Sequence, residues 1–497
     1  MINLSSFVAF HARRTPDRPA LKYRGEEISY AVFDARVRKV AGWLAAQGIG
    51  AGDVVAVLMK NSAAFLELVF ATSHLGAVFL PINFRLSRDE VGYITGDAGA
   101  RLLIADEELA VDAAGARVVI LDEAAQQSVT CLAGDSAAAP MNVRQPSDLM
   151  RLMYTSGTTD RPKGVMLSYD NFYWKSADQT IALGLSAETR LLVVGPLYHV
   201  GALDLPGIAV LWHGGFIHIE RSFEPESALA AIAEDKLNAA WFAPVMTTAM
   251  LTCTMRNRYD VSSLKWAIGG GEKTPELRIS AFSDYFRNAR YIDAYGLTET
   301  VGGDTFMDAG REIEKIGSTG RAIAHVEIEI RDEDGNKLPP NVNGEICLRG
   351  PKIMRGYWKD PEKTASAFFG EWFRSGDVGY LDDDGFLYLT DRKKDMIISG
   401  GENIASSEVE RVIYDLPEVR EVAVIGLRDP RWGERPIAIV VLAEGASLEL
   451  AALIEHCQLR LASFKVPKQL IIRASLPRNP SGKILKRVLR AELETVA

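Results

Sequence analysis

The chain has 497 residues, which exceeds the size at which a single hydrophobic core keeps growing, so we expect two or more domains. Hydrophobic residues make up 47% and charged residues 24%, a balance typical of globular proteins and not of disordered ones. The formal net charge of −9 argues against binding of nucleic acid, so an anionic ligand must be met by local charges.

The four cysteines form no Cys-x-x-Cys pair, which argues against a disulfide framework and a zinc site. The apolar run Phe7–Phe10 is too short for a signal peptide, and the apolar region Leu191–Trp212 is interrupted by His199, Asp204 and two prolines. We therefore expect a cytoplasmic protein without a transmembrane segment. Peripheral contact with a membrane and a homodimeric state stay open.

The first 150 residues alternate between helical and strand-like patterns. Apolar residues at helical spacing predict helices over Phe33–Gln47 and Ala63–Leu75. Short apolar runs predict strands over Val54–Met59, Leu102–Ala105 and Val118–Leu121. Alternation of this kind is typical of layered α/β structure.

A hydroxyl-rich loop, Tyr154–Gly164, follows the strand-like run Leu152–Tyr154 and precedes Val165–Leu167 and a helix predicted from Ser168. Its hydroxyls, its backbone N–H groups and Lys163 can converge on phosphoryl oxygens. The spacing is not that of a Walker loop. Considered alone, a polar surface loop is an alternative.

Three later segments repeat one arrangement, an apolar strand followed by Gly or Pro. They are Leu191–Leu203, Ala239–Pro244 and Trp266–Glu272. We expect their ends to form one crevice at the carboxyl edge of a parallel sheet.

The heptapeptide Ala294–Thr300 combines an aromatic ring, a hydroxyl and a carboxylate. Tyr295 could stack on a purine, Thr298 could donate to a phosphate, and Glu299 could bind Mg²⁺ as an oxygen ligand. The alternative is a buried core tyrosine beside a solvated glutamate.

From Val326 to Leu389 the pattern changes to hairpins, which predicts a small antiparallel barrel or sheet. Asp377, beside a glycine, could accept hydrogen bonds from both hydroxyls of a ribose. The charged segment Asp391–Asp395 is interpreted as a linker. A domain-sized remainder follows, and we expect helices over Ser407–Leu416 and Leu448–Leu461 and strands over Val422–Leu427, Ile437–Leu442 and Gln469–Ile472.

In this order and spacing, the loop, Tyr295–Glu299, Ser375–Asp377, Asp391–Asn403 and Pro480–Lys486 resemble the AMP-forming acyl-CoA synthetase family of the adenylate-forming superfamily. The resemblance runs from about residue 7 to about residue 493. It implies an α/β fold with a large N-terminal adenylation domain over residues 1–391, which includes layered α/β subdomains and a small antiparallel β-barrel at about 324–391. A smaller, mobile α+β C-terminal domain would occupy residues 392–497.

The resemblance implies that ATP, Mg²⁺ and CoA are bound, with Mg²⁺ on Glu299. It implies catalytic roles for Lys483, Thr298, Glu299 and His199. The residues it assigns to ATP are Thr155, Ser156, Gly157, Thr158, Thr159, Lys163, Gly270, Gly271, Glu272, Tyr295, Thr298, Asp377, Arg392 and Lys483. The acyl pocket would be lined by His199, Val200, Gly201, Trp241, Phe242, Gly270 and Gly296.

The implied reaction has two steps. A carboxylate attacks the α-phosphorus of ATP and expels pyrophosphate, and the acyl group then passes to the CoA thiol. Rotation about the hinge residue Lys394 would withdraw Lys483 between the steps and bring Gly400 and Gly401 to line the CoA channel. His199 would gate the carboxylate.

The acyl pocket indicates the substrate class. Val200 stands where amino-acid-activating relatives place an Asp, and the pocket has no fixed positive charge for a malonate-type acid. An apolar tail remains, either a medium-to-long fatty chain or an aryl or phenylpropenoic ring. The alternatives to a CoA ligase are an enzyme that loads a carrier protein and a non-catalytic nucleotide-binding regulator.

Two positions depart from the family pattern. Asp160 replaces a common glycine, and we expect it to turn to solvent or to pair with Arg161. Ser406 stands near the place of a usual proline. Asp204 and Asp304, near the expected acyl pocket, have no assigned role and could contact a polar substituent of the substrate.

Overall fold

The computed structural model describes residues 3–111, 113, 115–155, 162–270, 274, 276–392, 395–399, 402–478 and 484–494. Contacts divide the chain into two compact units. The first unit comprises Met1–Ile328 and Leu348–Phe373, and the second comprises Glu329–Cys347 and Arg374–Ala497. The predicted domain limits at 391 and 392 stay a prediction.

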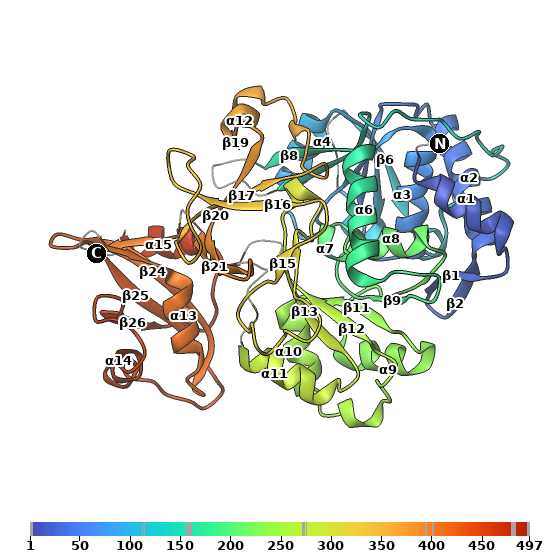
Figure 1. Ribbon diagram of the computed structural model, residues 1–497. Coiled ribbons are helices and arrows are strands. Elements are labelled where there is room, and N and C mark those ends of the chain that lie inside the picture. The colour runs from blue at the N-terminus through green and yellow to red at the C-terminus, as the bar shows by residue number, and fades with distance from the viewer. Residues whose placement is uncertain are drawn as a thin grey trace. The chain divides into compact units, whose positions relative to one another are not determined.

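A nine-stranded sheet carries the predicted crevice strands in the first unit (Figure 1). Its spatial order is β15 (Arg321–Ala322), β14 (Thr305–Phe306), β13 (Arg290–Tyr295), β12 (Trp266–Gly269), β11 (Ala239–Phe242), β9 (Arg190–Val193), β10 (Phe216–Ile219), β1 (Pro19–Tyr23) and β2 (Glu26–Ser29). The strands from β13 to β1 are parallel. The carboxyl ends of β9, β11, β12 and β13 therefore share one edge, as predicted.

A seven-stranded sheet carries the hydroxyl-rich loop. Its order is β18 (Gly356–Tyr357), β8 (Lys163–Ser168), β7 (Leu149–Thr155), β4 (Val78–Pro81), β3 (Val54–Leu58), β5 (Ala100–Asp106) and β6 (Arg117–Leu121). Strands β7 and β8 form an antiparallel hairpin, whereas β7, β4, β3, β5 and β6 are parallel.

Helices fill the space between these two sheets (Figure 1). Helix α3 (Ala63–Leu75) contacts β4 and β1, and α6 (Tyr169–Leu183) contacts β8 and α8 (Gly207–Trp212). Every residue of α3 is buried, as expected for a helix covered on all sides. The remaining helices of the first unit are α1 (Ser5–Arg14), α2 (Tyr30–Ala46), α4 (Arg88–Ala98), α5 (Glu123–Gln127), α7 (Val200–Leu203), α9 (Pro225–Asp235), α10 (Pro244–Thr252), α11 (Glu276–Tyr285) and α12 (Pro361–Ser366).

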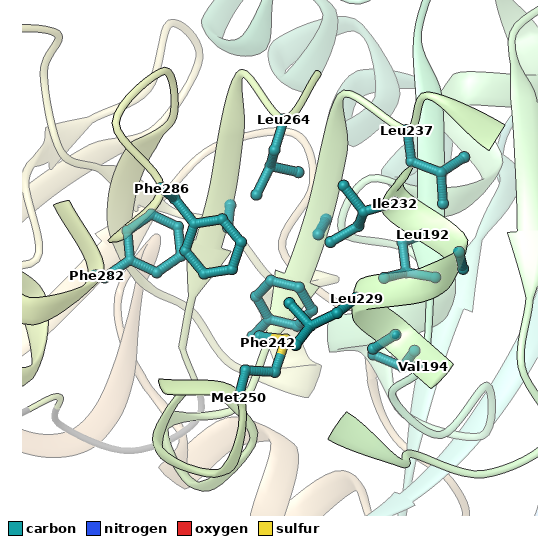
Figure 2. Close-up of a cluster of buried hydrophobic side chains, with 14 of the residues drawn as sticks. Leu192, Val194, Leu229, Ile232, Leu237, Phe242, Met250, Leu264, Phe282 and Phe286 are labelled. Carbon is teal, nitrogen blue, oxygen red and sulfur yellow. The ribbon is translucent and has the colours of Figure 1, made fainter. Parts of the chain in front are cut away.

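The outer face of the nine-stranded sheet is covered by α9, α10 and α11. Figure 2 shows the apolar cluster between the sheet and these helices, where Phe242 from β11 packs near Leu229 of α9 and Met250 of α10. Burial of these side chains fixes the helices on the sheet and so holds the strand ends in place.

The predicted hairpin region forms a small antiparallel sheet. Its strands are β16 (Glu327–Arg331), β17 (Gly344–Arg349), β20 (Trp372–Leu381), β19 (Phe368–Phe369) and β21 (Leu387–Arg392). The turn at Asp384–Gly385 joins β20 to β21, as the sequence predicts. The division between the two units passes through this sheet.

The second unit also has a five-stranded sheet of its own. Its strands are β23 (Glu402–Ile404), β22 (Ile397–Ser399), β25 (Gly433–Leu442), β24 (Val419–Asp429) and β26 (Gln469–Ile472). Helices α13 (Ser406–Tyr414), α14 (Leu450–Gln458) and α15 (Lys486–Glu494) accompany it. Both predicted helices and all three predicted strands of this region are present. In the described part of the chain, no helix has the length and apolarity needed to cross a membrane.

Candidate active site

The ends of the hydroxyl-rich loop meet across the β7–β8 hairpin, where Thr155 pairs with Lys163. The Thr155 hydroxyl is buried and has no hydrogen-bond partner in the described part of the chain. An orphaned buried hydroxyl at this point suits a phosphoryl oxygen. Between them, Ser156, Gly157, Thr158, Thr159, Asp160 and Arg161 lie outside the described residues.

Tyr357 connects two of the predicted site residues. The Lys163 ammonium donates to the Tyr357 hydroxyl over 2.9 Å, and that hydroxyl donates to Glu299 Oε1 over 3.1 Å. Lys163 Nζ also lies 4.1 Å from the centroid of the Tyr357 ring. A cation and a carboxylate thus share one phenol at the end of the loop.

Burial and the charge of Glu299 both act on Lys163 and Tyr357, with opposite effects on Lys163 and the same effect on Tyr357. Burial lowers the pKa of Lys163, and the charge of Glu299 opposes that shift. Burial and the same carboxylate raise the pKa of Tyr357, so its hydroxyl keeps its proton. The neutral Tyr357 hydroxyl therefore lies between the ammonium and the carboxylate in a partly buried environment.

Sequence reasoning missed Tyr357. Its strand, β18, pairs with β8 and places Tyr357 opposite Val165, two residues from Lys163 along the chain. Tyr357 is about 190 residues from Lys163 in the sequence, and its strand is too short to show a periodic pattern. Only the tertiary structure therefore brings Tyr357 to the site.

The heptapeptide after β13 turns sharply back on itself. Tyr295 ends the strand, and a short 3-10 helix, Thr298–Thr300, carries Glu299. A Cβ added at Gly296 would stand 2.3 Å from the backbone nitrogen of Gly303, so this position requires glycine. Glu299 is only 9% exposed, which makes the alternative of a solvated glutamate wrong. Tyr295 is buried, and its stacking on a purine stays a prediction.

The surroundings of the Glu299 carboxylate bear on its role as a Mg²⁺ ligand. Within the described residues no group of three or more His, Cys, Asp and Glu side chains could hold a metal. Mg²⁺ is commonly held by one or two carboxylates together with substrate phosphates and water. A single buried carboxylate near the phosphate loop fits that mode of binding.

His199 begins the short helix α7 after β9. Its Nδ1 accepts a hydrogen bond from the Gly201 N–H over 3.1 Å, so a neutral imidazole carries its proton on Nε2. The same helix buries Val200. The predicted strand and turn over Leu191–Leu203 thus becomes β9 followed by one helical turn.

Trp241 and Phe242 point to opposite faces of β11, as neighbours in a strand do. A Cβ at Gly195 or Gly201 would lie 2.6 Å from the six-membered ring of Trp241, so the indole occupies the space that both glycines leave. Gly270 follows β12 and lies near Ala294 and the indole nitrogen. Phe242 belongs to the buried cluster in Figure 2, so the structure corrects its assignment from the acyl pocket to the core.

Asp204 and Asp304 each form an ion pair with a buried basic side chain. Arg151 Nη1 lies 2.5 Å from Asp204, and Lys352 Nζ lies 2.7 Å from Asp304. Lys352 also donates to the carbonyls of Gly302 and Gly303. Each carboxylate thus has a cationic partner within the protein, and its contact with a polar substituent of a substrate stays a prediction.

Asp377 and Arg392 face each other across β20 and β21 of the second unit. The Asp377 N–H donates to the Ser375 hydroxyl, and its side chain is 9% exposed. The pairing brings together the backbones of two of the residues assigned to the nucleotide in this unit. The other assigned positions lie outside the described residues; these are Gly271, Glu272, Lys394, Gly400, Gly401 and Lys483.

A model of the AMP-binding enzyme family matches residues 8–358, and one of the AMP-binding enzyme C-terminal domain matches residues 408–483. The chain belongs to the AMP-binding enzyme family. Feruloyl-CoA synthase of Amycolatopsis sp. is 37% identical to this AMP-binding enzyme over 98% of either chain. Long-chain-fatty-acid–CoA ligase FadD13 of Mycobacterium tuberculosis is 35% identical over 94% of this chain and 93% of its own.

The fold of this AMP-binding enzyme is also that of a solved CoA ligase. o-Succinylbenzoate CoA synthetase (MenE) of Bacillus subtilis, in complex with the acyl-adenylate intermediate OSB-AMP, matches with a TM-score of 0.88 and 29% identity. The match covers 98% of this chain and 97% of that one. These findings confirm the predicted fold and the predicted class, an ATP-dependent CoA ligase that forms AMP.

Proposed function

We propose that this AMP-binding enzyme activates an aromatic monocarboxylic acid of the phenylpropenoic type and transfers the acyl group to CoA. The observation that carries the ATP-dependent step is the hydrogen-bonded chain Lys163–Tyr357–Glu299 beside the ends of the loop. It offers a cation and an anchored carboxylate at the point where a triphosphate would bind.

In the first step, an oxygen of the acid attacks the α-phosphorus of ATP, and pyrophosphate leaves. Lys163 and the Thr155 hydroxyl bind the β- and γ-phosphates, and Thr298 donates to the α-phosphate. Glu299 would hold Mg²⁺, which when bound neutralises part of the phosphate charge. The assigned role of Lys483 is to supply positive charge between the carboxylate and the α-phosphate, which would lower the repulsion between two anions.

In the second step, the CoA thiol attacks the acyl carbon and AMP leaves. Rotation at Lys394 withdraws Lys483 and brings Gly400 and Gly401 to the thiol's path. In the second unit, Asp377 and Arg392 hold the ribose and phosphate, which positions the adenylate for both steps.

The acyl pocket favours a flat substrate. The Trp241 indole fills the space beside Gly195 and Gly201, which supports an aromatic wall at that point. Similarity to feruloyl-CoA synthase supports an aromatic acid. A long-chain fatty acid is the second candidate, because FadD13 is nearly as similar.

The test is a screen of acids with the purified protein, ATP, Mg²⁺ and CoA, in which pyrophosphate and acyl-CoA are both quantified. We expect cinnamic-type acids to give stoichiometric pyrophosphate and acyl-CoA, with higher kcat/KM than fatty acids of 8 to about 16 carbons. Pyrophosphate without any CoA thioester would contradict the ligase and would favour transfer to a carrier protein. The Lys483→Ala variant should bind ATP and form no adenylate.

A further inference from the structure

Helix α6 buries several polar side chains that the reaction does not use, among them Lys175 and Gln179. Lys175 and Gln179 stand one helical turn apart, which puts them on the same face, and both are fully buried. In the described part of the chain, neither the Lys175 ammonium nor either polar atom of the Gln179 amide has a hydrogen-bond partner. Unpaired polar groups at such depth are costly, so a fold that retains them calls for an explanation.

The charged side chains around Lys175 do not offset the positive charge of its ammonium. Asp204 attracts its ammonium, while Arg151 and Lys352 repel it, and Asp204 is already paired with Arg151. The Phe172 ring, with its centroid 5.8 Å from Lys175 Nζ, adds only a weak attraction. Burial accordingly lowers the pKa of Lys175 to about 7. An oxygen atom that accepts a hydrogen bond from the Lys175 ammonium would stabilise its charged form.

Gln179 lies next to a glycine turn that also contacts Val200, a residue expected to line the acyl pocket. A Cβ added at Gly303 would stand 3.2 Å from Gln179 Nε2, and one at Gly302 would stand 3.5 Å from a methyl group of Val200. Both glycines have positive φ, and Lys352 holds their carbonyls. The Gly302–Gly303 turn therefore contacts the pocket residue Val200 on one side and Gln179 on the other, without side chains of its own.

We propose that Gln179 and Lys175 form a polar subsite in the wall of the acyl pocket that binds a phenolic hydroxyl on the ring of the substrate. This inference rests on the proposed function and narrows its substrate class to hydroxylated aryl acids. The Gln179 amide can both accept the phenol proton and donate to the phenol oxygen, and Lys175 can donate to the same oxygen. A hydrocarbon tail would leave all three groups unpaired.

The test compares two acids of nearly equal size, 4-hydroxycinnamic and 4-methylcinnamic acid, by the kcat/KM of acyl-CoA formation. We expect the wild-type enzyme to prefer the hydroxy acid by at least about tenfold, since a site built for a hydroxyl rejects an analogue that lacks it. Gln179→Leu and Lys175→Met should each reduce this preference to about threefold or less. Gln126→Leu, which changes a buried glutamine of α5 in the same way, should leave it unchanged.

Equal kcat/KM for both acids with the wild-type enzyme would overturn the subsite, and this measurement does not depend on any variant folding. A Gln179→Leu variant that loses activity equally with both acids would also overturn it, because that result indicates a structural role. Failure of the wild-type enzyme to make any acyl-CoA would instead contradict the proposed function.

Discussion

The phenol of Tyr357 has one proton and two charged neighbours. It donates that proton to Glu299 and accepts a hydrogen bond from Lys163, so its orientation is fixed by both. Without the hydroxyl, the carboxylate and the ammonium would each lose a partner in a partly buried place. Such losses commonly cost about 1–3 kcal/mol.

We therefore expect Tyr357→Phe to lower kcat/KM for ATP by about tenfold in an assay of pyrophosphate release, because Lys163 and Glu299 are no longer held. The matched control is Tyr414→Phe, which removes a hydroxyl from an exposed tyrosine of α13. That control should retain wild-type kinetics. Unchanged ATP kinetics in Tyr357→Phe would mean that the phenol does not position either charge.

Among the elements, α3 carries a carboxylate inside a helix that is buried on every side. Glu67 accepts hydrogen bonds from the Ser128 hydroxyl and the Val129 N–H, and Arg36 Nη1 lies 3.5 Å away. Burial nevertheless raises the pKa of Glu67 from 4.5 to about 7. The folded protein thus binds this proton more tightly than the unfolded chain does.

The sign of the pH effect follows from that difference. The contribution of Glu67 to stability is fully present below pH 4.5 and is lost as the pH rises through about 7, by at most about 3 kcal/mol. We expect Glu67→Gln to remove this component, so the Tm of the variant relative to wild type should rise between pH 5 and pH 8. A Tm difference that is constant over this range would contradict the raised pKa.

Helix α13 begins at the position where the sequence departs from the family pattern. Asp391 accepts hydrogen bonds from the backbone N–H of Ser406 over 2.6 Å and from its hydroxyl over 2.5 Å. Lys486 of α15 also donates to the Ser406 hydroxyl and pairs with Glu410. A proline at 406 would lack both the N–H and the hydroxyl, so serine here ties the start of α13 to β21 and α15.

Removal of this cap should weaken α13. We expect Asp391→Ala to lower stability by about 1 kcal/mol, seen as a lower thermal midpoint. Asp415→Ala, at the other end of the same helix, is the control, since a carboxylate there does not favour the helix dipole. Equal midpoints for Asp391→Ala and wild type would show that the cap contributes little.

At the scale of the whole molecule, the sequence predicted some elements to the residue, as with β26 and with α3, which Ser62 and Gly76 bound as caps. It missed β13, whose alternation is broken by Asp293 and whose central position buries both faces. Motif spacing identified Lys163 and Glu299. It could not identify Tyr357, Lys175 or Gln179, because their significance comes from contacts between distant segments.

The residues assigned to the two half-reactions occur in both compact units, with Lys163 and Glu299 in the first and Asp377 in the second. Rotation at the predicted hinge, Lys394, is the proposed way in which the chain serves both steps. Proline restricts φ to about −65° and so opposes rotation at that point. We expect Lys394→Pro to form acyl-adenylate at a rate within about threefold of wild type and to lower acyl-CoA formation by at least about a hundredfold.

Single-turnover reactions, quenched and separated by chromatography, would measure acyl-adenylate and acyl-CoA independently. Lys394→Ala is the matched control, because it removes the same ammonium and leaves the backbone free to rotate. That control should complete both steps at rates close to those of wild type. If Lys394→Pro slowed both half-reactions equally, the residue would support the fold of the linker and the hinge would have to lie elsewhere.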